Sequence, residues 1–404
     1  MISLKEAHGI IEKIVPLDST VIPIDKALGH ICAEDVYALV DCPTVDSSLK
    51  DGFALIASDI EHATPERPIK LFVSGVLTAG GEAGSFQVNR GEAIRIMTGA
   101  EIPMGATSVV ASEFATSTGN GVLVSADAKA GRNILCRGSD ITKGQLVLGR
   151  GLLLEPAHLG LLASSGVGSL LCYPAPEVAV AATGSELVWP GEEVVPGKVA
   201  ASNMVTAEAE LSRLGCKTST TILRDNLDSL EDQLRAIVKQ VDLLITCGGI
   251  LDGDKDLTMK AMERLGMEKI FHRVRIGPGK GACLGRIGKT IVCNLPGGPP
   301  SNHVALLLLA LPVCRRLMGF ASCFPRKSRV VVEGDLFGQK DWTQLVYSRV
   351  RYNSDTLTAV PLQDYGRLTA IGEANALIEL PESYASATAG SQVSAWIYNA
   401  ENVL

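Results

Sequence analysis

The chain has 404 residues and a formal net charge of −7. This length is more than one hydrophobic core usually organises, and it predicts about two to four domains. The acidic balance gives no overall basic field, which argues against nucleic acid or an anionic membrane as a partner and favours a small ligand. The N-terminus lacks a signal-peptide pattern, and the longest apolar stretch, residues 304–313, is shorter than the roughly 20 residues of a membrane span. We therefore expect a cytoplasmic protein.

The ten cysteines occur singly along the chain, with no CxxC pair and no regular spacing. This pattern argues against a zinc site and against a disulfide framework. Most of the thiols are expected to be small buried apolar side chains.

Residues 1–176 are expected to form an N-terminal region that is helical at its two ends. Ser3 and Glu6 have the spacing of a capping box at the start of a helix, and residues 156–165 have a second helical pattern. Between them, short β-type runs and Gly-rich turns predict a β-rich insert over about residues 45–145.

Residues 177–320 alternate between strand and helix patterns, which is typical of a doubly wound α/β domain. The expected strands are 178–182, 218–223, 242–247 and 290–295. The expected helices are 203–214, a helix capped by Asp228, 257–265 and 301–318. Residues 326–404 return to β-type patterning and predict a small β-barrel or sandwich.

Four glycine-marked loops follow apolar runs in the α/β region, at residues 182–186, 223–225, 247–256 and 295–299. If these runs are parallel strands, the loops meet at the carboxyl edge of one sheet, where open α/β sheets bind ligands. The sequence therefore predicts a binding crevice there.

The predicted crevice is rich in carboxylates, which are Glu186, Asp225, Asp252, Asp254 and Asp256. Clustered carboxylates suit Mg²⁺, which prefers oxygen ligands and is commonly shared with phosphates. The glycines allow backbone N–H groups to approach an anion. The alternative is that these acids cap helices and solvated turns, and Asp256 in particular precedes the helix expected from residue 257.

A lysine in a tight turn, Lys280 of Gly277-Pro278-Gly279-Lys280-Gly281, is a candidate for binding a phosphate or another oxyanion. The same turn is also compatible with an ordinary Gly-Pro connection. Residues 288–290 do not form a nucleotide P-loop, because the first glycine is missing and a strand is expected to follow. No GxSxG pattern accompanies His158 or His303, so no catalytic triad is indicated.

Two polar, glycine-marked segments in the N-terminal region, residues 46–54 and 95–100, are either turns or part of a ligand site. Together with residues 137–140, 183–187, 248–256, 278–280 and 295–301, they occur in the order found in the molybdopterin molybdenumtransferases, the MoeA and gephyrin E-domain family. The chain resembles this family over essentially its whole length.

This resemblance implies an α/β multidomain fold with four structural domains per subunit. It includes N-terminal helical and β-rich regions, a doubly wound α/β domain similar to MoaB and Mog proteins, and a C-terminal β-barrel. It also implies an elongated homodimer whose active site lies between the α/β domain of one subunit and the N-terminal region of the other. The implied reaction is the Mg²⁺-dependent insertion of molybdate into adenylylated molybdopterin, with release of AMP.

The resemblance also assigns roles to individual residues by motif. The implied catalytic residues are Asp51, Glu186, Asp225, Asp256 and Lys280, of which Glu186, Asp225 and Asp256 are the implied metal ligands. The implied pterin- and cofactor-binding residues are Thr98, Asp140, Gly248, Gly249, Pro296, Gly297, Pro299 and Ser301.

Several loops depart from the family pattern. Ser185 stands where an aspartate is usual, Gly298 stands where an asparagine is usual, and Gly281 replaces a proline. Three functions therefore remain open: an insertase, an insertase with an altered oxyanion or pterin preference, and a non-catalytic carrier or assembly scaffold. Possible protein partners are a molybdopterin adenylyltransferase and an apo-molybdoenzyme.

Overall fold

The structure is a computed structural model that describes residues 1–126, 128–248, 257–353, 356–362 and 366–399. Two compact units are present. The first comprises Met1–Thr20, Gly29–Ala33 and Cys172–Leu404, and the second comprises Val21–Leu28 and Glu34–Leu171. Among the described residues, no helix has the length and hydropathy needed to cross a membrane.

The second unit is built around a six-stranded sheet with the strand order β8-β5-β7-β6-β10-β9. Its strands are β5 (Gly52–Leu55), β6 (Ile69–Leu77), β7 (Glu92–Ile96), β8 (Ser108–Ala111), β9 (Ala115–Thr118) and β10 (Gly121–Val124). Side chains alternate between the two faces of a strand, so Phe53 joins one apolar cluster and Ala54 joins another. Both faces of this sheet therefore carry apolar clusters, and its strands lie within the β-rich insert expected over about residues 45–145.

Shorter elements make up the rest of the N-terminal half. They are the strands β1 (Thr20–Pro23), β2 (Ile31–Cys32), β3 (Val36–Tyr37), β4 (Ser47–Ser48), β11 (Ile134–Leu135), β12 (Leu146–Leu148) and β13 (Ser169–Tyr173), and the helix α2 (Pro156–Ser164). Four 3₁₀ turns accompany them, η1 (Ile24–Lys26), η2 (Ala57–Ile60), η3 (Ala83–Ser85) and η4 (Ser112–Phe114).

The first unit contains the expected α/β sheet, with the strand order β17-β14-β18-β22-β21-β19. The strands β14 (Glu177–Thr183), β17 (Lys217–Leu223), β18 (Leu243–Cys247) and β22 (Thr290–Leu295) are parallel. Beyond β22, the strand β21 (Cys283–Ile287) and the edge strand β19 (Glu268–His272) each pair with their neighbours in the antiparallel direction. The strand that follows Lys289 is β22, so the exclusion of a P-loop there is confirmed.

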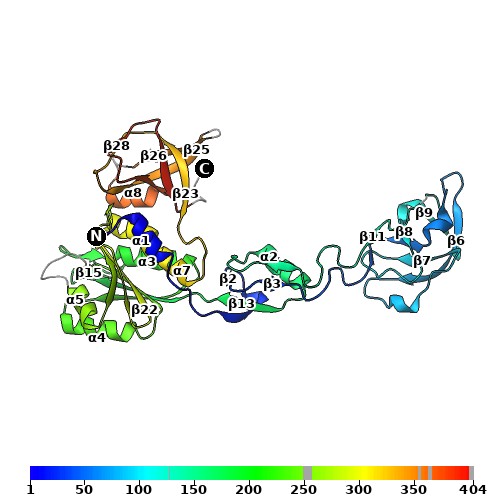
Figure 1. Cartoon of the computed structure of the whole chain (residues 1–404), viewed down its shortest axis with the longest axis horizontal. Helices are drawn as coiled ribbons and strands as arrows, with labels where there is room; N and C mark the ends of the chain where they lie inside the picture. Colours follow the sequence, from blue (N-terminus) through cyan, green and yellow to red (C-terminus); the bar gives the residue numbers. More distant parts are fainter. Residues whose placement is uncertain (127, 249–256, 354–355, 363–365, 400–404) are drawn as a thin grey trace. The chain divides into compact units, whose positions relative to one another are not determined.

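Helices cover both faces of this sheet, which confirms the doubly wound arrangement (Figure 1). The helices on one face are α1 (Leu4–Ile11), α3 (Ser202–Arg213), α6 (Pro299–Ala305) and α7 (Leu311–Leu317), the last two joined by the π-helical turn η5 (Leu306–Ala310). The helices on the other face are α4 (Leu227–Ile237) and α5 (Leu257–Arg264).

The helix ends follow from local capping. Ser3 and Glu6 form the expected capping box at the start of α1. The predicted cap of α4 was wrong: the side chain of Asn226, not Asp228, accepts a hydrogen bond from Ser229 N at 3.0 Å, and Asp228 lies in the first turn. Both residue types cap helices well, so the sequence alone favoured neither over the other.

The C-terminal strands form a closed barrel. β25 (Thr343–Asn353), β26 (Thr356–Pro361), β23 (Arg326–Val332), β29 (Gln392–Ile397) and β27 (Ala376–Leu380) follow one another, and an additional pairing of β25 with β27 closes the ring. This pairing decides for the barrel over the sandwich. β20 (Ile276–Gly277) joins the barrel edge, and the short helix α8 (Arg367–Glu373), which was not predicted, packs against β25 and α6.

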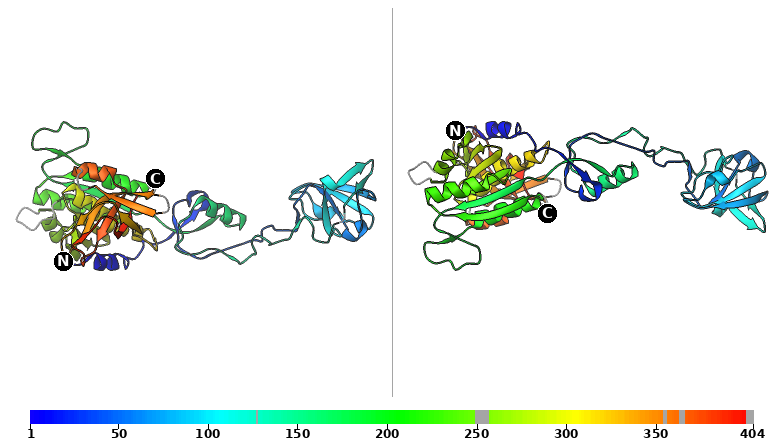
Figure 2. Two further views of the ribbon diagram at one scale, coloured as in Figure 1. Left: turned by 90° about the horizontal axis from the view of Figure 1, so that it is seen from above. Right: turned by 90° about the horizontal axis from the view of Figure 1, so that it is seen from below.

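Four short strands complete the first unit. They are β15 (Leu187–Val188), β16 (Val199–Ala200), β24 (Leu336–Phe337) and β28 (Ser386–Ala387). Residues 189–198, between β15 and β16, extend from the sheet as a loop (Figure 2). All ten cysteines are free thiols, and only Cys42 and Cys136 are not buried, so most are buried side chains as expected.

Two histidines lie on the helices of the first unit, next to the barrel: His8 is partly buried and His303 is buried. His8 Nε2 lies 3.0 Å from Leu308 O, and its ring stacks on Phe324 at 4.0 Å. His303 Nδ1 lies 3.2 Å from the hydroxyl of Tyr347. Burial lowers the pKa of both histidines from 6.5 to about 4.

We expect the thermal stability to fall as the pH is lowered from 6.5 to 4. In that window the unfolded chain takes up a proton at His8 and at His303 while the folded protein does not, so the folded state loses stability. The check is the melting temperature as a function of pH for the protein and for His303→Asn. The variant should show a shallower decline, and an equally steep decline would contradict the assignment.

Candidate active site

The four strand ends from which the predicted loops start lie side by side, because the parallel strands end at the same level. In the sheet register Thr183 of β14 pairs with Leu223 of β17, and Ala182 pairs with Cys247 of β18. Cys247 in turn pairs with Leu295 of β22. The segments that begin at 184, 224, 248 and 296 therefore leave one edge of the sheet together.

Hydrogen bonds in both directions join the loops after β14 and β17. The carboxylate of Asp225 accepts a hydrogen bond from Ser185 N at 2.9 Å, and Asp225 N donates to the hydroxyl of Ser185 at 3.3 Å. Lys198 and Arg224 both donate to Ser185 O, at 2.7 Å and 3.3 Å. The serine that departs from the family pattern is thus the residue through which this chain orients Asp225.

Glu186 lies in the same loop and its carboxylate folds back over Gly184. A Cβ atom at Gly184 would lie 2.6 Å from the carboxylate oxygens of Glu186, and Gly184 has a φ of +154°. Glycine therefore lets the carboxylate approach the backbone closely. Within the ranges that the structure describes, neither Glu186 nor Asp225 has an ion-pair partner.

The donor chemistry of these two carboxylates fits a hard divalent cation, which prefers oxygen ligands. No group of three or more His, Cys, Asp or Glu side chains able to hold a metal occurs among the described residues. The third expected ligand, Asp256, lies outside those residues, as do Asp252, Asp254 and Gly249.

The loops after β18 and β22 approach each other through glycine. Gly248 has a φ of +114°, and a Cβ atom there would lie 2.7 Å from Thr183 O. A Cβ atom at Gly297 would lie 3.6 Å from the Cα of Gly248. The buried hydroxyl of Thr183 finds no hydrogen-bond partner among the described residues. Only glycine fits at 248, because any side chain would separate β18 from β14.

Two asparagines hold the loop that leads into α6. Asn302 Nδ2 donates to Pro296 O at 2.9 Å, and Asn203 Nδ2 of α3 donates to Gly297 O at 2.8 Å. Pro299 occupies the first helical position of α6, where its fixed φ suits the helix, and Ser301 lies in the first turn. The expected binding residues Pro296, Gly297, Pro299 and Ser301 therefore form one braced segment.

Lys280 lies in the turn between β20 and β21, beside this segment. A Cβ atom at Gly281 would lie 3.7 Å from Cγ of Pro296. The ammonium group of Lys280 lies 5.3 Å from the ring centroid of Trp342, which immediately precedes β25 of the barrel. This cation–π contact directs the lysine without neutralising its charge.

The remaining expected site residues belong to the second unit. Asp51 and Thr98, which are 47 positions apart, lie together: the Asp51 carboxylate accepts hydrogen bonds from Thr98 N at 2.7 Å and Thr98 Oγ1 at 2.8 Å. These bonds lower the pKa of Asp51. Asp140 is exposed, and its N–H donates to Cys42 O at 3.0 Å.

Five residues that shape these loops were not expected from the sequence, namely Lys198, Asn203, Arg224, Asn302 and Trp342. Asn302 directly follows the Pro299-Pro300-Ser301 segment, and Arg224 directly precedes Asp225. Their adjacency to expected site residues could have identified both. Trp342 had no such signal, because its contact with Lys280 spans 62 positions.

Two family models match the chain. One, described as "MoeA N-terminal region (domain I and II)", matches residues 2–166, and the other, described as "Probable molybdopterin binding domain", matches residues 179–316.

Similar proteins were found over nearly the whole chain. A relative from Staphylococcus epidermidis, named molybdopterin molybdenumtransferase, is 30% identical over 396 residues, which is 97% of this chain and 94% of that protein. A relative of the same name from Haemophilus influenzae is 33% identical over 323 residues, covering 79% and 78%. A crystal structure of a molybdopterin biosynthesis MoeA protein from Pyrococcus horikosii aligns with 30% identity, a TM-score of 0.84 and 99% coverage of both chains.

Proposed function

Because the chain belongs to the molybdopterin molybdenumtransferase family, we propose that it takes part in molybdenum cofactor biosynthesis as an enzyme that inserts molybdate into adenylylated molybdopterin and releases AMP. The observation that carries this proposal is the convergence of four strand ends at one edge of the sheet, with two carboxylates, several glycines and the turn that contains Lys280 beside them. Such an arrangement suits a substrate that has a phosphate bridge and an oxyanion.

We propose that Glu186, Asp225 and Asp256 hold Mg²⁺. When bound, the ion would supply positive charge that offsets the charge of the pyrophosphate bridge. The hydrogen bond from Ser185 N occupies one carboxylate oxygen of Asp225 and leaves the other free for this role. Glu186, held over Gly184, presents its carboxylate from the adjacent strand end.

The other site residues would bind and orient the substrate. Gly248 and Gly297 allow the backbone to approach it closely, and Asn203 and Asn302 keep the loop after β22 in place. Lys280 would hold the incoming molybdate as a point charge. In this proposal positioning and electrostatic stabilisation supply most of the rate acceleration.

The test of this function is a reconstitution with purified protein, adenylylated molybdopterin, molybdate and Mg²⁺, in which active cofactor is quantified. Cofactor should form only when molybdate and Mg²⁺ are both present. Tight pterin binding without cofactor formation would instead support a carrier or scaffold. The departures from the family pattern at Ser185, Gly281 and Gly298 favour this alternative. Parallel reactions with tungstate test the oxyanion preference.

A change of Trp342 to leucine is expected to raise the KM for molybdate by about 2- to 5-fold, because an exposed cation–π contact contributes roughly 0.5–1 kcal/mol. Trp342→Phe should retain most of the affinity, since its ring still faces the ammonium of Lys280. Steady-state kinetics with varied molybdate provide the check. An unchanged KM in the leucine variant would show that Lys280 does not depend on the ring.

We also propose a homodimer in which Asp51, Thr98 and Asp140 from one subunit complete the site of the other. Light scattering should then give a mass of about twice the 42.5 kDa of one chain. A 1:1 mixture of the single variants Asp51→Asn and Glu186→Gln, refolded together, should recover roughly a quarter of the activity, because half of the dimers are mixed and each has one intact site. If the mixture recovers no activity, Asp51 and Glu186 belong to a site formed within a single subunit.

A further inference from the structure

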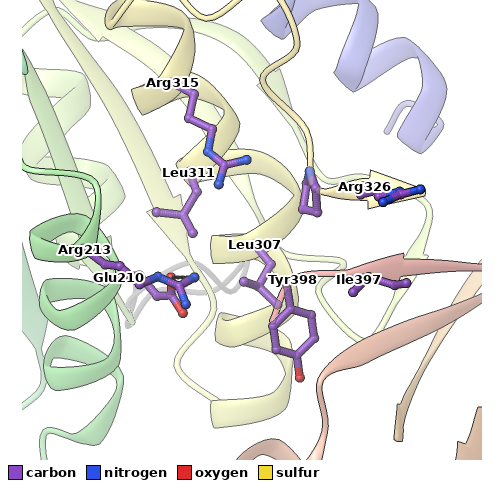
Figure 3. A pocket seen from close by; sticks show the side chains of 9 residues that line it. Glu210, Arg213, Leu307, Leu311, Arg315, Arg326, Ile397 and Tyr398 are labelled. Carbon is purple, nitrogen blue, oxygen red and sulfur yellow. Dashed lines mark hydrogen bonds and ion pairs between the residues drawn. The ribbon is translucent and has the colours of Figure 1, made fainter. Parts of the chain in front are cut away.

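A small pocket of about 100 Å³ lies within the first unit, between α3, α7 and the start and end of the barrel (Figure 3). Leu307 and Leu311 contribute apolar surface, and Tyr398 contributes an aromatic wall. Glu210, Arg213 and Arg315 bring charged groups to the same space. None of these residues belongs to the site described above.

The charges in this pocket are unbalanced. Arg213 pairs with Glu210 at 2.8 Å, which leaves Arg315 without a carboxylate partner among the residues described. Arg326, at the pocket margin, likewise has no ion-pair partner within those ranges. The pKa of Arg315 is lowered, first by burial and then by electrostatic repulsion from the guanidinium group of Arg213.

The hydrogen bonding of Arg315 is also incomplete. Its Nε is buried and has no partner among the described residues, and its best polar contact is a 3.5 Å approach of one terminal nitrogen to Cys323 O. A buried donor without a partner is costly, and a guanidinium group in this state is suited to an oxyanion, to which it donates in parallel pairs. The hydroxyl proton of Tyr398 is already used in a hydrogen bond, because it is donated to Ala374 O at 2.9 Å.

The size of the pocket limits the ligand. Sites for drug-sized ligands typically have about 300–1,000 Å³, so a pterin or a nucleotide is too large, whereas a small tetrahedral ion fits. We infer that this pocket binds a small tetrahedral oxyanion of the phosphate, sulfate or molybdate class between Arg213 and Arg315. Such an ion would relieve the repulsion between the two arginines and link α3 to α7.

This pocket is separate from the proposed active site in the same unit. Asn203, near the start of α3, contacts the loop after β22, whereas Glu210 and Arg213 lie at the other end of the same helix. At about 1.5 Å per residue the two ends are roughly 15 Å apart. A ligand at Lys280 and one at Arg315 are therefore distinguishable by substitution.

The test is a titration of the purified full-length protein with phosphate, sulfate and molybdate, each compared with chloride at the same ionic strength, with the melting temperature and the calorimetric Kd as readouts. We expect a saturable rise of the melting temperature with at least one tetrahedral oxyanion and none with chloride. The ion with the lowest Kd is the one that the pocket prefers. A preference for molybdate would indicate a reservoir of substrate, and a preference for phosphate or sulfate would indicate a structural ion.

Arg315→Met should weaken this binding at least tenfold while leaving the protein folded, because it removes a half-buried cation. Arg213→Met, at an exposed helix end, is a second variant that should weaken binding as well. Lys280→Met, which affects only the proposed active site, and Arg235→Met, on the far helix α4, are matched controls that should keep the response to phosphate and sulfate. With molybdate, which Lys280 is also proposed to bind, only the component that persists in Lys280→Met and is lost in Arg315→Met is assigned to this pocket. No saturable difference from chloride, or an undiminished response in both pocket variants, would overturn the inference.

Discussion

Asp225→Asn is expected to lower the rate of AMP release by about 100-fold or more, because it removes one of the charges proposed to hold Mg²⁺. Asparagine keeps an oxygen that can accept the hydrogen bond from Ser185 N, so the loops after β14 and β17 should remain joined. The loss therefore reports the charge of the side chain and not the collapse of the loop. The measurement is the single-turnover rate of AMP release at saturating pterin.

The matched control is Asp228→Asn, three residues further along. Asp228 is exposed on α4 and approaches Arg264 at 3.3 Å, and such surface pairs contribute little. This control should retain the full rate, and added Mg²⁺ should partly restore Asp225→Asn if the defect is weakened metal binding. A full rate in Asp225→Asn at low Mg²⁺ would remove Asp225 from the metal site.

Gly248→Ala is expected to lower the free energy of unfolding by about 2–4 kcal/mol, combining the cost of a non-glycine residue at positive φ with the cost of an overpacked contact. Gly248 has a φ of +114°, and the new methyl group would lie 2.7 Å from Thr183 O. To accommodate the methyl group, residue 248 must move away from Thr183 of β14, so pterin affinity should fall as well. Urea unfolding and equilibrium pterin binding measure the two effects.

Gly298→Ala provides the comparison for this change. Gly298 has a φ of −70°, and a Cβ atom there meets nothing within 4 Å, so the substitution should be tolerated. If Gly248→Ala were as stable as Gly298→Ala, the close approach of β18 to β14 would not constrain the site.

The sequence was most informative where one local pattern determined the geometry. The alternation of apolar runs and helices in residues 177–320 predicted parallel strands, and parallel strands bring their carboxyl ends together. The register of Thr183 with Leu223 and of Cys247 with Leu295 is the direct result. The capping box at Ser3 was similarly local and was confirmed.

The contacts that could not be predicted join residues far apart in the sequence. Whether the C-terminal strands formed a barrel or a sandwich depended on β25 pairing with β27, which no strand pattern specifies. The contact of Trp342 with Lys280 and the mutual hydrogen bonds of Ser185 and Asp225 also require the folded sheet. In the sequence Ser185 was only a departure from the family pattern, whereas in the structure its backbone N–H and hydroxyl orient Asp225.

The most direct measurement of the proposed catalysis is the ratio of AMP released to active cofactor formed when the purified protein is given adenylylated molybdopterin, molybdate and Mg²⁺. We expect one AMP for each cofactor, and neither product when Mg²⁺ is chelated. Stable pterin binding with no AMP above the chelated control would contradict it and identify the chain as a carrier.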